Sequence, residues 1–129
     1  MRLAVSIFIA AHGIGFSIWF MSAWIPAALD ADARHVTLLP GTPATGALGK
    51  ALGLLALLVL IGFLATAWGV WQQTPWWPTT MMGSVATSLL VAVAVWNPVG
   101  IVSVPATLAS IALLLATITP LGDRLLGPH

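Results

Sequence analysis

The sequence predicts an all-α protein, an integral membrane antiparallel four-helix bundle that occupies residues 1–129 as a single domain. Three observations predict it: 60% of the residues are hydrophobic, 5% are charged, and the apolar residues are gathered in four long runs. A soluble domain carries roughly 25% charged residues, so this composition excludes a water-soluble fold. A membrane-spanning helix needs ~20 apolar residues, and four such helices take up most of the chain.

The first predicted span covers about residues 3–25 and is interrupted only by His12. At ~1.5 Å per residue it is long enough to cross a ~30 Å hydrocarbon core with some tilt. A cleavable signal peptide is the competing interpretation, because Arg2 precedes the apolar run. An h-region is normally about 7–15 residues long, so we expect an uncleaved helix that ends at Pro26.

A long polar loop is predicted at about residues 26–47, where Pro and Gly punctuate a segment without a sustained apolar period. The other three spans are predicted at about 48–71, 79–96 and 99–119, and short turns join them. Because short connections favour antiparallel neighbours, both termini are expected on one side of the bundle. Pro105 would lie inside the fourth span and kink it.

Tryptophan residues lie near the predicted span ends, where aromatic side chains favour the membrane interface. We expect one interface to hold Trp68, Trp71, Trp76 and Trp77, and the other to hold Trp24 and Trp96.

The basic residues divide evenly between the two predicted faces, with Arg2 and Arg124 on one and Arg34 and Lys50 on the other. Arg2 and Arg124 lie close to span ends, where positive charge most strongly sets orientation. We therefore expect a multi-pass protein of the bacterial inner membrane with both termini in the cytoplasm.

Small residues recur at helical spacing in all four predicted spans, as in the pair Gly49 and Gly53. Such stripes let helix backbones approach closely, and we expect them to serve packing within the bundle more often than an outward interface. In the third span the predicted stripe runs through Gly83, Thr87 and Ala94 and shares its face with Leu90.

His12 is the candidate site residue, since it is the ionisable side chain placed near the middle of a span. Ionisable groups within a membrane mark functional sites by default and rarely face lipid. The structural alternative is a neutral His that hydrogen-bonds a Ser, a Thr or a backbone carbonyl of a neighbouring helix. The functional alternatives are a cofactor-binding role toward haem, a pigment or a quinone, and a contact to a lipid, a substrate or a partner subunit.

Composition also bears on the remaining functional classes. A net charge of +1 is too small to bind nucleic acid, and the chain has no Cys for thiolate metal or disulfide chemistry. No carboxylate lies inside a predicted span, and neither a catalytic triad nor a phosphate-binding loop can be assembled. Catalytic activity of the chain on its own is therefore not expected, and no metal site or cofactor is predicted.

The string Ala11-His12-Gly13 in the first span, the Gly- and Pro-rich loop and the Pro-Trp-Trp turn at 75–77 resemble a group of small four-span bacterial membrane proteins labelled permease-like or DoxX-like. The resemblance implies a four-helix membrane bundle and supplies no mechanism. We expect a non-catalytic membrane subunit or accessory protein that packs in the lipid bilayer against its own copies or against other membrane subunits. The alternatives are a membrane protein that binds a small ligand through His12, and a small transporter.

Overall fold

The computed structural model describes residues 1–25, 42–43, 45–95, 103–120 and 124, and this part of the chain is all-helical. Its helices are, in chain order, α1 (Arg2–Gly15), α2 (Ser17–Trp24), α3 (Ala47–Gln72), α4 (Trp77–Ala94) and α5 (Ser103–Ile118). Most of the predicted polar loop lies outside the described residues, as do Trp96 and residues 99–102 of the predicted fourth span.

α1 and α2 together form one apolar rod of 23 residues. The break between them is a single tightened turn at Phe16, whose backbone N–H donates to the Gly13 carbonyl over 3.0 Å. Phe16 keeps right-handed helical dihedrals, with φ −73° and ψ −17°, so the chain direction is preserved through the break. The rod matches the predicted first span.

Three helical segments are long and apolar enough to cross a membrane: Arg2–Trp24, Ala47–Gln72 and Trp77–Ala94. The last of these begins two residues before the predicted third span, because Pro78 fits the first turn of a helix and so continues the helix that Trp77 begins. α5 is also apolar but has only 16 residues in its described part. Pro105 is the third residue of this described part, and the residues before Ser103 at which a kink was expected lie outside the described residues, so the kink stays a prediction.

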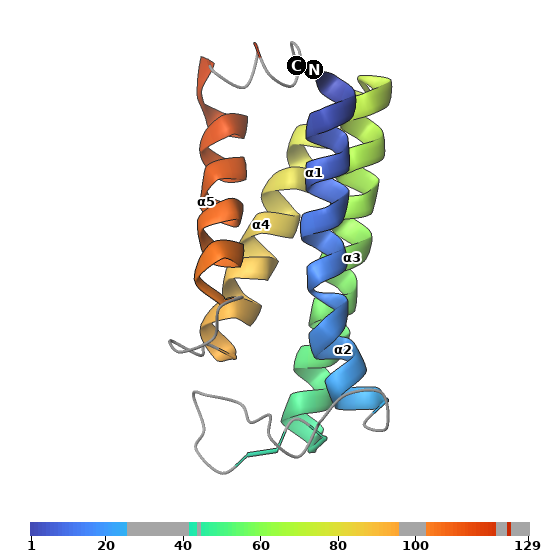
Figure 1. Cartoon of the computed structure of the whole chain (residues 1–129), viewed down its shortest axis with the longest axis vertical. Coiled ribbons are helices and arrows are strands. Elements are labelled where there is room, and N and C mark those ends of the chain that lie inside the picture. Colours follow the sequence, from blue (N-terminus) through green and yellow to red (C-terminus); the bar gives the residue numbers. More distant parts are fainter. Residues whose placement is uncertain (26–41, 44, 96–102, 121–123, 125–129) are drawn as a thin grey trace.

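The α1–α2 rod, α3, α4 and α5 run in alternating directions along the long axis of the molecule, and the chain begins at the end where α5 finishes (Figure 1). α3 packs against α1, α2 and α4, whereas α5 packs mainly on α4 and touches α1 over a small area. The largest fully buried side chains come from α1, α3 and α4: Ile9, Val59, Phe63, Val70, Trp77, Met81, Val85 and Val91.

The turn between α3 and α4 explains why Trp77 is buried while the other tryptophans at this end are exposed. Gln73 adopts a left-handed conformation with φ 56°, and the next residue, Thr74, returns its N–H to the Gly69 carbonyl over 3.0 Å. This tight turn places Trp77 directly over Gly69, where an added Cβ would lie 2.8 Å from the Trp77 Cβ. Trp77 is therefore a core residue, 1% exposed. Trp68, Trp71 and Trp76 at the same end of the molecule are exposed, and the place of all four at a membrane interface stays a prediction.

Glycines on α1 and α3 mark the close approaches of the helix backbones. A Cβ added to Gly13 would lie 2.6 Å from the Phe63 Cβ, and one added to Gly53 would lie 2.9 Å from the Ala23 Cβ. Gly62 meets Ser84 of α4 in the same way. The small residues of these two helices thus serve internal packing, as predicted.

The predicted stripe on α4 packs inside the described bundle at Ala94 but not at Gly83 or Leu90. An added Cβ on Gly83 would meet nothing within 4 Å, and Leu90 is 60% exposed. The neighbouring residues Ser84 and Ser88 are buried instead. Gly83 and Ser84 are both small, so size alone could not choose between their faces; the fit of Ser84 against Gly62 decides it.

A matched pair of substitutions tests the close approach of α1 and α3. Gly13→Ala forces a methyl group against Phe63, and we expect it to lower the free energy of unfolding by about 1–3 kcal/mol, as overpacking does. Gly15→Ala adds a methyl group in open space and should change that free energy by less than about 1 kcal/mol, since only helix propensity is altered. Equilibrium denaturation in detergent micelles measures both, and equal effects would contradict this packing.

Candidate functional site

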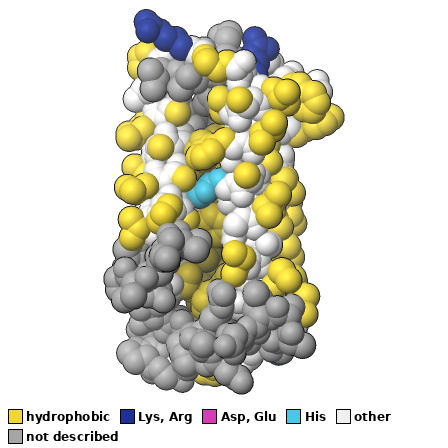
Figure 2. All heavy atoms as spheres, viewed as in Figure 1, with side chains coloured by type: hydrophobic (Ala, Val, Ile, Leu, Met, Phe, Trp, Pro, Cys, Tyr) yellow, Lys and Arg dark blue, Asp and Glu magenta, His cyan; other side chains and the backbone are white. Residues whose placement is uncertain are grey.

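The candidate site is centred on His12, which lies on α1 and is half-buried. Figure 2 shows its side chain midway between the two ends of the molecule, in a cleft flanked by two columns of mostly apolar surface. The cleft follows from the fold, because α5 and α1 touch over a small area only. The described Lys and Arg side chains belong to residues near helix ends, so the ring lies in an apolar and uncharged stretch of the described structure.

A chain of hydrogen bonds leads from His12 across two further helices. His12 Nε2 lies 2.9 Å from Ser110 Oγ on α5, and Ser110 Oγ lies 3.0 Å from Ser88 Oγ on α4. Ser88 Oγ in turn donates to the backbone carbonyl of Val85 over 2.8 Å. These hydrogen bonds therefore connect α1, α5 and α4 through three side chains.

The direction of these hydrogen bonds follows from counting protons. A serine hydroxyl has a single proton, and Ser88 gives its proton to the Val85 carbonyl. Ser110 must then donate to Ser88, which leaves only the lone pairs of Ser110 for His12. His12 consequently donates through Nε2–H, so the neutral form of the ring carries its proton on Nε2. The backbone carbonyl at the end of the chain thus selects the tautomer of a ring on another helix.

Aromatic rings surround the imidazole on its other sides. The Phe63 ring of α3 meets it edge-on with the ring centroids 5.0 Å apart, and the Phe16 ring does so at 5.6 Å. Phe8 stacks nearly parallel at 6.4 Å. Since Phe63 comes from α3, His12 contacts or is linked to every long element of the bundle.

The contacts decide which chemistry His12 can perform. Nε2 is already used as a donor, so a haem or metal that binds through this nitrogen would have to break the bond to Ser110. Nδ1 keeps a lone pair in this tautomer and can accept a hydrogen bond or bind a metal. No group of three or more His, Cys, Asp or Glu side chains that could hold a metal ion occurs among the described residues.

Sequence reasoning anticipated the kind of partner but not its full extent. A Ser or Thr on a neighbouring helix was expected for His12, and Ser110 lies on the small-residue stripe expected in the fourth span. Ser88 was missed because the predicted α4 stripe followed Gly83 instead. The available signal was the pair Ser84 and Ser88, two hydroxyls one helical turn apart beside Val85 and Val91, all four of which are buried.

The hydrogen-bond chain predicts coupled effects of substitution. His12→Leu should lower the free energy of unfolding by about 0.6 kcal/mol and at most about 2 kcal/mol, the range for hydrogen bonds between membrane helices, while His12→Asn should retain most of it. In the double variant His12→Leu/Ser110→Ala, the loss of unfolding free energy should be smaller than the sum of the two single losses, because both substitutions break the same chain of hydrogen bonds. Ser22→Ala is the matched control, because Ser22 bonds only the Ile18 carbonyl of its own helix. If the changes in unfolding free energy of His12→Leu and Ser110→Ala simply add in the double variant, the hydrogen-bond chain is refuted.

Comparison of the chain with models of known protein families, with curated proteins and with solved structures gives no match. The function is therefore inferred from the contacts of the chain itself.

Proposed function

We propose that the chain is an integral membrane protein, an antiparallel bundle of four spans, that acts as a non-catalytic subunit or accessory protein. It packs against its own copies or against other subunits within a bacterial inner membrane. The same assignment fits the resemblance to small four-span membrane proteins. Experiments that measure membrane insertion and assembly, rather than catalytic turnover, test this proposal.

One observation carries this proposal: two buried serines of the described interior, Ser88 and Ser110, link α4 and α5 to His12 of α1 by hydrogen bonds. Ser88 and Ser110 join His12 to the Val85 carbonyl, while Thr66 and Thr117 each bond a carbonyl one turn back in their own helix. Polar groups that are satisfied in this way stabilise a bundle in lipid, where no water replaces a lost partner. The interior is thus organised for helix association and not around a reacting group.

The outer surface supports the membrane environment. Leucines such as Leu58, Leu108 and Leu115 are more than half exposed on the spans, where lipid rather than water would contact them. At the end of α3 nearer the loop, Lys50 Nζ lies 5.3 Å from the Trp24 ring centroid. This pairing suits an interface, where a lysine stem lies along apolar surface and its ammonium reaches water.

A second candidate function, the binding of a small ligand, is favoured by the position of His12 in the open cleft between α1 and α5 (Figure 2). A haem, a pigment or a quinone would meet the Nδ1 lone pair there. In that case the purified protein carries a chromophore, and both His12→Asn and His12→Leu abolish its absorption without unfolding the chain. A colourless protein whose His12→Asn variant behaves as the wild type supports the structural role instead.

Cysteine labelling tests the spans, because the chain contains no Cys. Thr45→Cys and Gln72→Cys flank α3, and Leu58→Cys lies near its middle on the exposed side. In intact cells a membrane-impermeant maleimide should label Thr45→Cys at once and Gln72→Cys only after permeabilisation, since Gln72 lies at the end of the bundle that holds Arg2. Leu58→Cys should resist labelling in both conditions. Labelling of all three from outside would rule out a spanning α3.

Mass measurement tests the assembly. After extraction in a mild detergent, we expect a mass above that of one chain plus its detergent, from further copies or from co-purified membrane subunits. A monomer that co-purifies with nothing would contradict the subunit role while leaving membrane insertion intact.

A further inference from the structure

A second feature of α1, on a different face from His12, is an open groove between α1 and α3. Its volume is about 250 Å³, below the range of roughly 300–1,000 Å³ that suits drug-sized ligands. α1 contributes Leu3, Ser6, Ile7 and Ala10, whose spacing of three and four residues keeps them on one side of the helix. A groove of this volume can take part of a flexible acyl chain.

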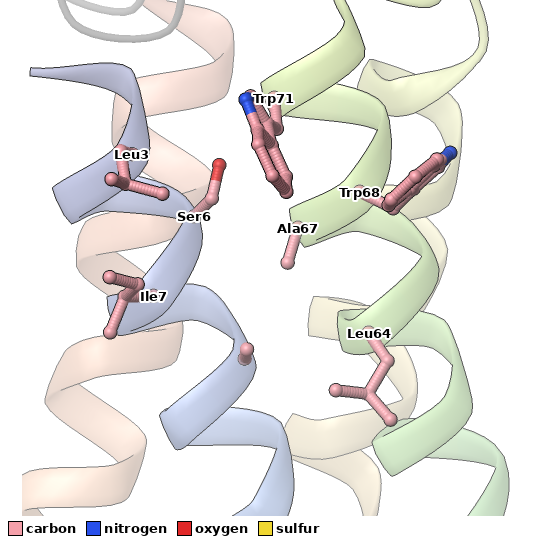
Figure 3. A pocket seen from close by; sticks show the side chains of 8 residues that line it. Leu3, Ser6, Ile7, Leu64, Ala67, Trp68 and Trp71 are labelled. Carbon is pink, nitrogen blue, oxygen red and sulfur yellow. The ribbon is translucent and has the colours of Figure 1, made fainter.

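The wall formed by α3 is apolar in its depth and aromatic toward one end. Leu64, Ala67, Trp68 and Trp71 form this wall, and Trp71 stands nearest the end where α1 begins (Figure 3). Trp68 and Trp71 pack edge-to-face with ring centroids 5.8 Å apart. The groove is therefore apolar throughout, aliphatic in its depth and aromatic toward one end.

Ser6 is the anomaly in this groove. Its side chain is 5% exposed, and its Oγ is buried without a hydrogen-bond partner. The other buried serines described, Ser22, Ser84, Ser88 and Ser110, all make hydrogen bonds. A buried hydroxyl left without a partner destabilises a protein by about 1–3 kcal/mol, so such a group calls for a partner from outside the chain. Figure 3 shows the hydroxyl directed between the two helices and toward the end of the groove where α1 begins.

The groups around that end are all donors. The indole nitrogen of Trp71 points the same way as Ser6 Oγ (Figure 3). Arg2 precedes Ser6 by one helical turn, about 6 Å along the axis, on the same face of α1. A ligand that satisfies these groups must carry acceptor oxygens and a negative charge at one end and an apolar chain at the other.

We propose that this groove binds one acyl chain of an anionic glycerophospholipid. An ester carbonyl accepts the Ser6 hydroxyl hydrogen bond, and the headgroup phosphate lies beside Arg2. The acyl chain of the lipid then continues past Ile7 and Ala10 and lies against Leu64 and Ala67. This inference rests on the proposed membrane location of the protein, and it adds a defined lipid site on one leaflet.

Native mass spectrometry of the detergent-extracted protein tests the site, with phosphatidylglycerol and phosphatidylcholine of identical acyl chains as probes. We expect one tightly bound lipid, with phosphatidylglycerol preferred roughly fivefold, the effect of one arginine near a lipid headgroup. Arg2→Gln should remove this preference. Arg124→Gln is the control, because it removes a charge at the same end of the molecule but outside the groove.

Ser6 has its own matched variants. Ser6→Ala should weaken binding of both lipids roughly 2- to 12-fold, the range of one hydrogen bond, and Ser6→Thr should restore it. Ser22→Ala, which alters a buried serine near the other end of the rod, should leave binding unchanged. Helical circular dichroism of each variant confirms that it is folded, so that loss of binding is read as loss of the site.

The possible outcomes separate this proposal from the membrane location. Equal affinities for the two lipids, or a Ser6→Ala variant that binds as the wild type does, overturn the lipid site even when the labelling of Thr45→Cys and Gln72→Cys confirms the spans. Preferential binding of a quinone, tested as an uncharged acceptor ligand, also overturns it. Failure of the labelling experiment would instead overturn the membrane location itself.

Discussion

The close approach of α1 and α3 at Gly13 is the constraint on which the rest of the structure depends. Because Gly13 has no side chain, Phe63 lies against the α1 backbone, and the adjacent ring of His12 is then held edge-on to Phe63. On the other side of α3, Gly62 admits Ser84 and so fixes the rotation of α4. That rotation turns Ser88, one turn further along α4, toward α5. Glycines on two helices thereby determine where the polar side chains meet.

The chain of hydrogen bonds from His12 to Val85 contributes more to holding α5 than to holding the other helices, because α5 has little other contact with α1. α5 leans on α4 and reaches α1 over a small area, so the bond between His12 and Ser110 closes the ring of helices at its weakest side. Hydrogen bonds between membrane helices contribute only about 0.6 kcal/mol on average. A contribution of that size is close to the thermal energy, so the packing on α4 sets the position of α5 and the hydrogen bond adds a small preference for bringing Ser110 to His12.

A structural feature could be predicted from the sequence when many residues together determine it, and not when it depends on a single contact. The helical class and three long apolar helices follow from composition and run length, since these are properties of many residues together. The partner type of His12 followed from the rule that a membrane-buried imidazole needs a hydrogen-bonding neighbour. The buried place of Trp77 could not be predicted, because it depends on a turn between α3 and α4 that has no local signature. The choice of Ser88 over Thr87 depends on the contact of Gly62 with Ser84, and the pair Ser84 and Ser88 was its only sign in the sequence.

Ser6 and His12, the two polar side chains of α1 that are buried or half-buried, show why burial alone does not define a functional residue. His12 is the more conspicuous in the sequence, yet its Nε2 proton is used within the chain and its ring is enclosed by phenylalanines. Ser6 is inconspicuous, since serine is common in membrane helices and normally bonds the carbonyl one turn back. Its hydroxyl departs from that habit, being buried and without a partner beside an apolar groove. An unsatisfied donor in lipid carries a free-energy penalty that a satisfied histidine does not, so Ser6 is where the fold has most to gain from a ligand.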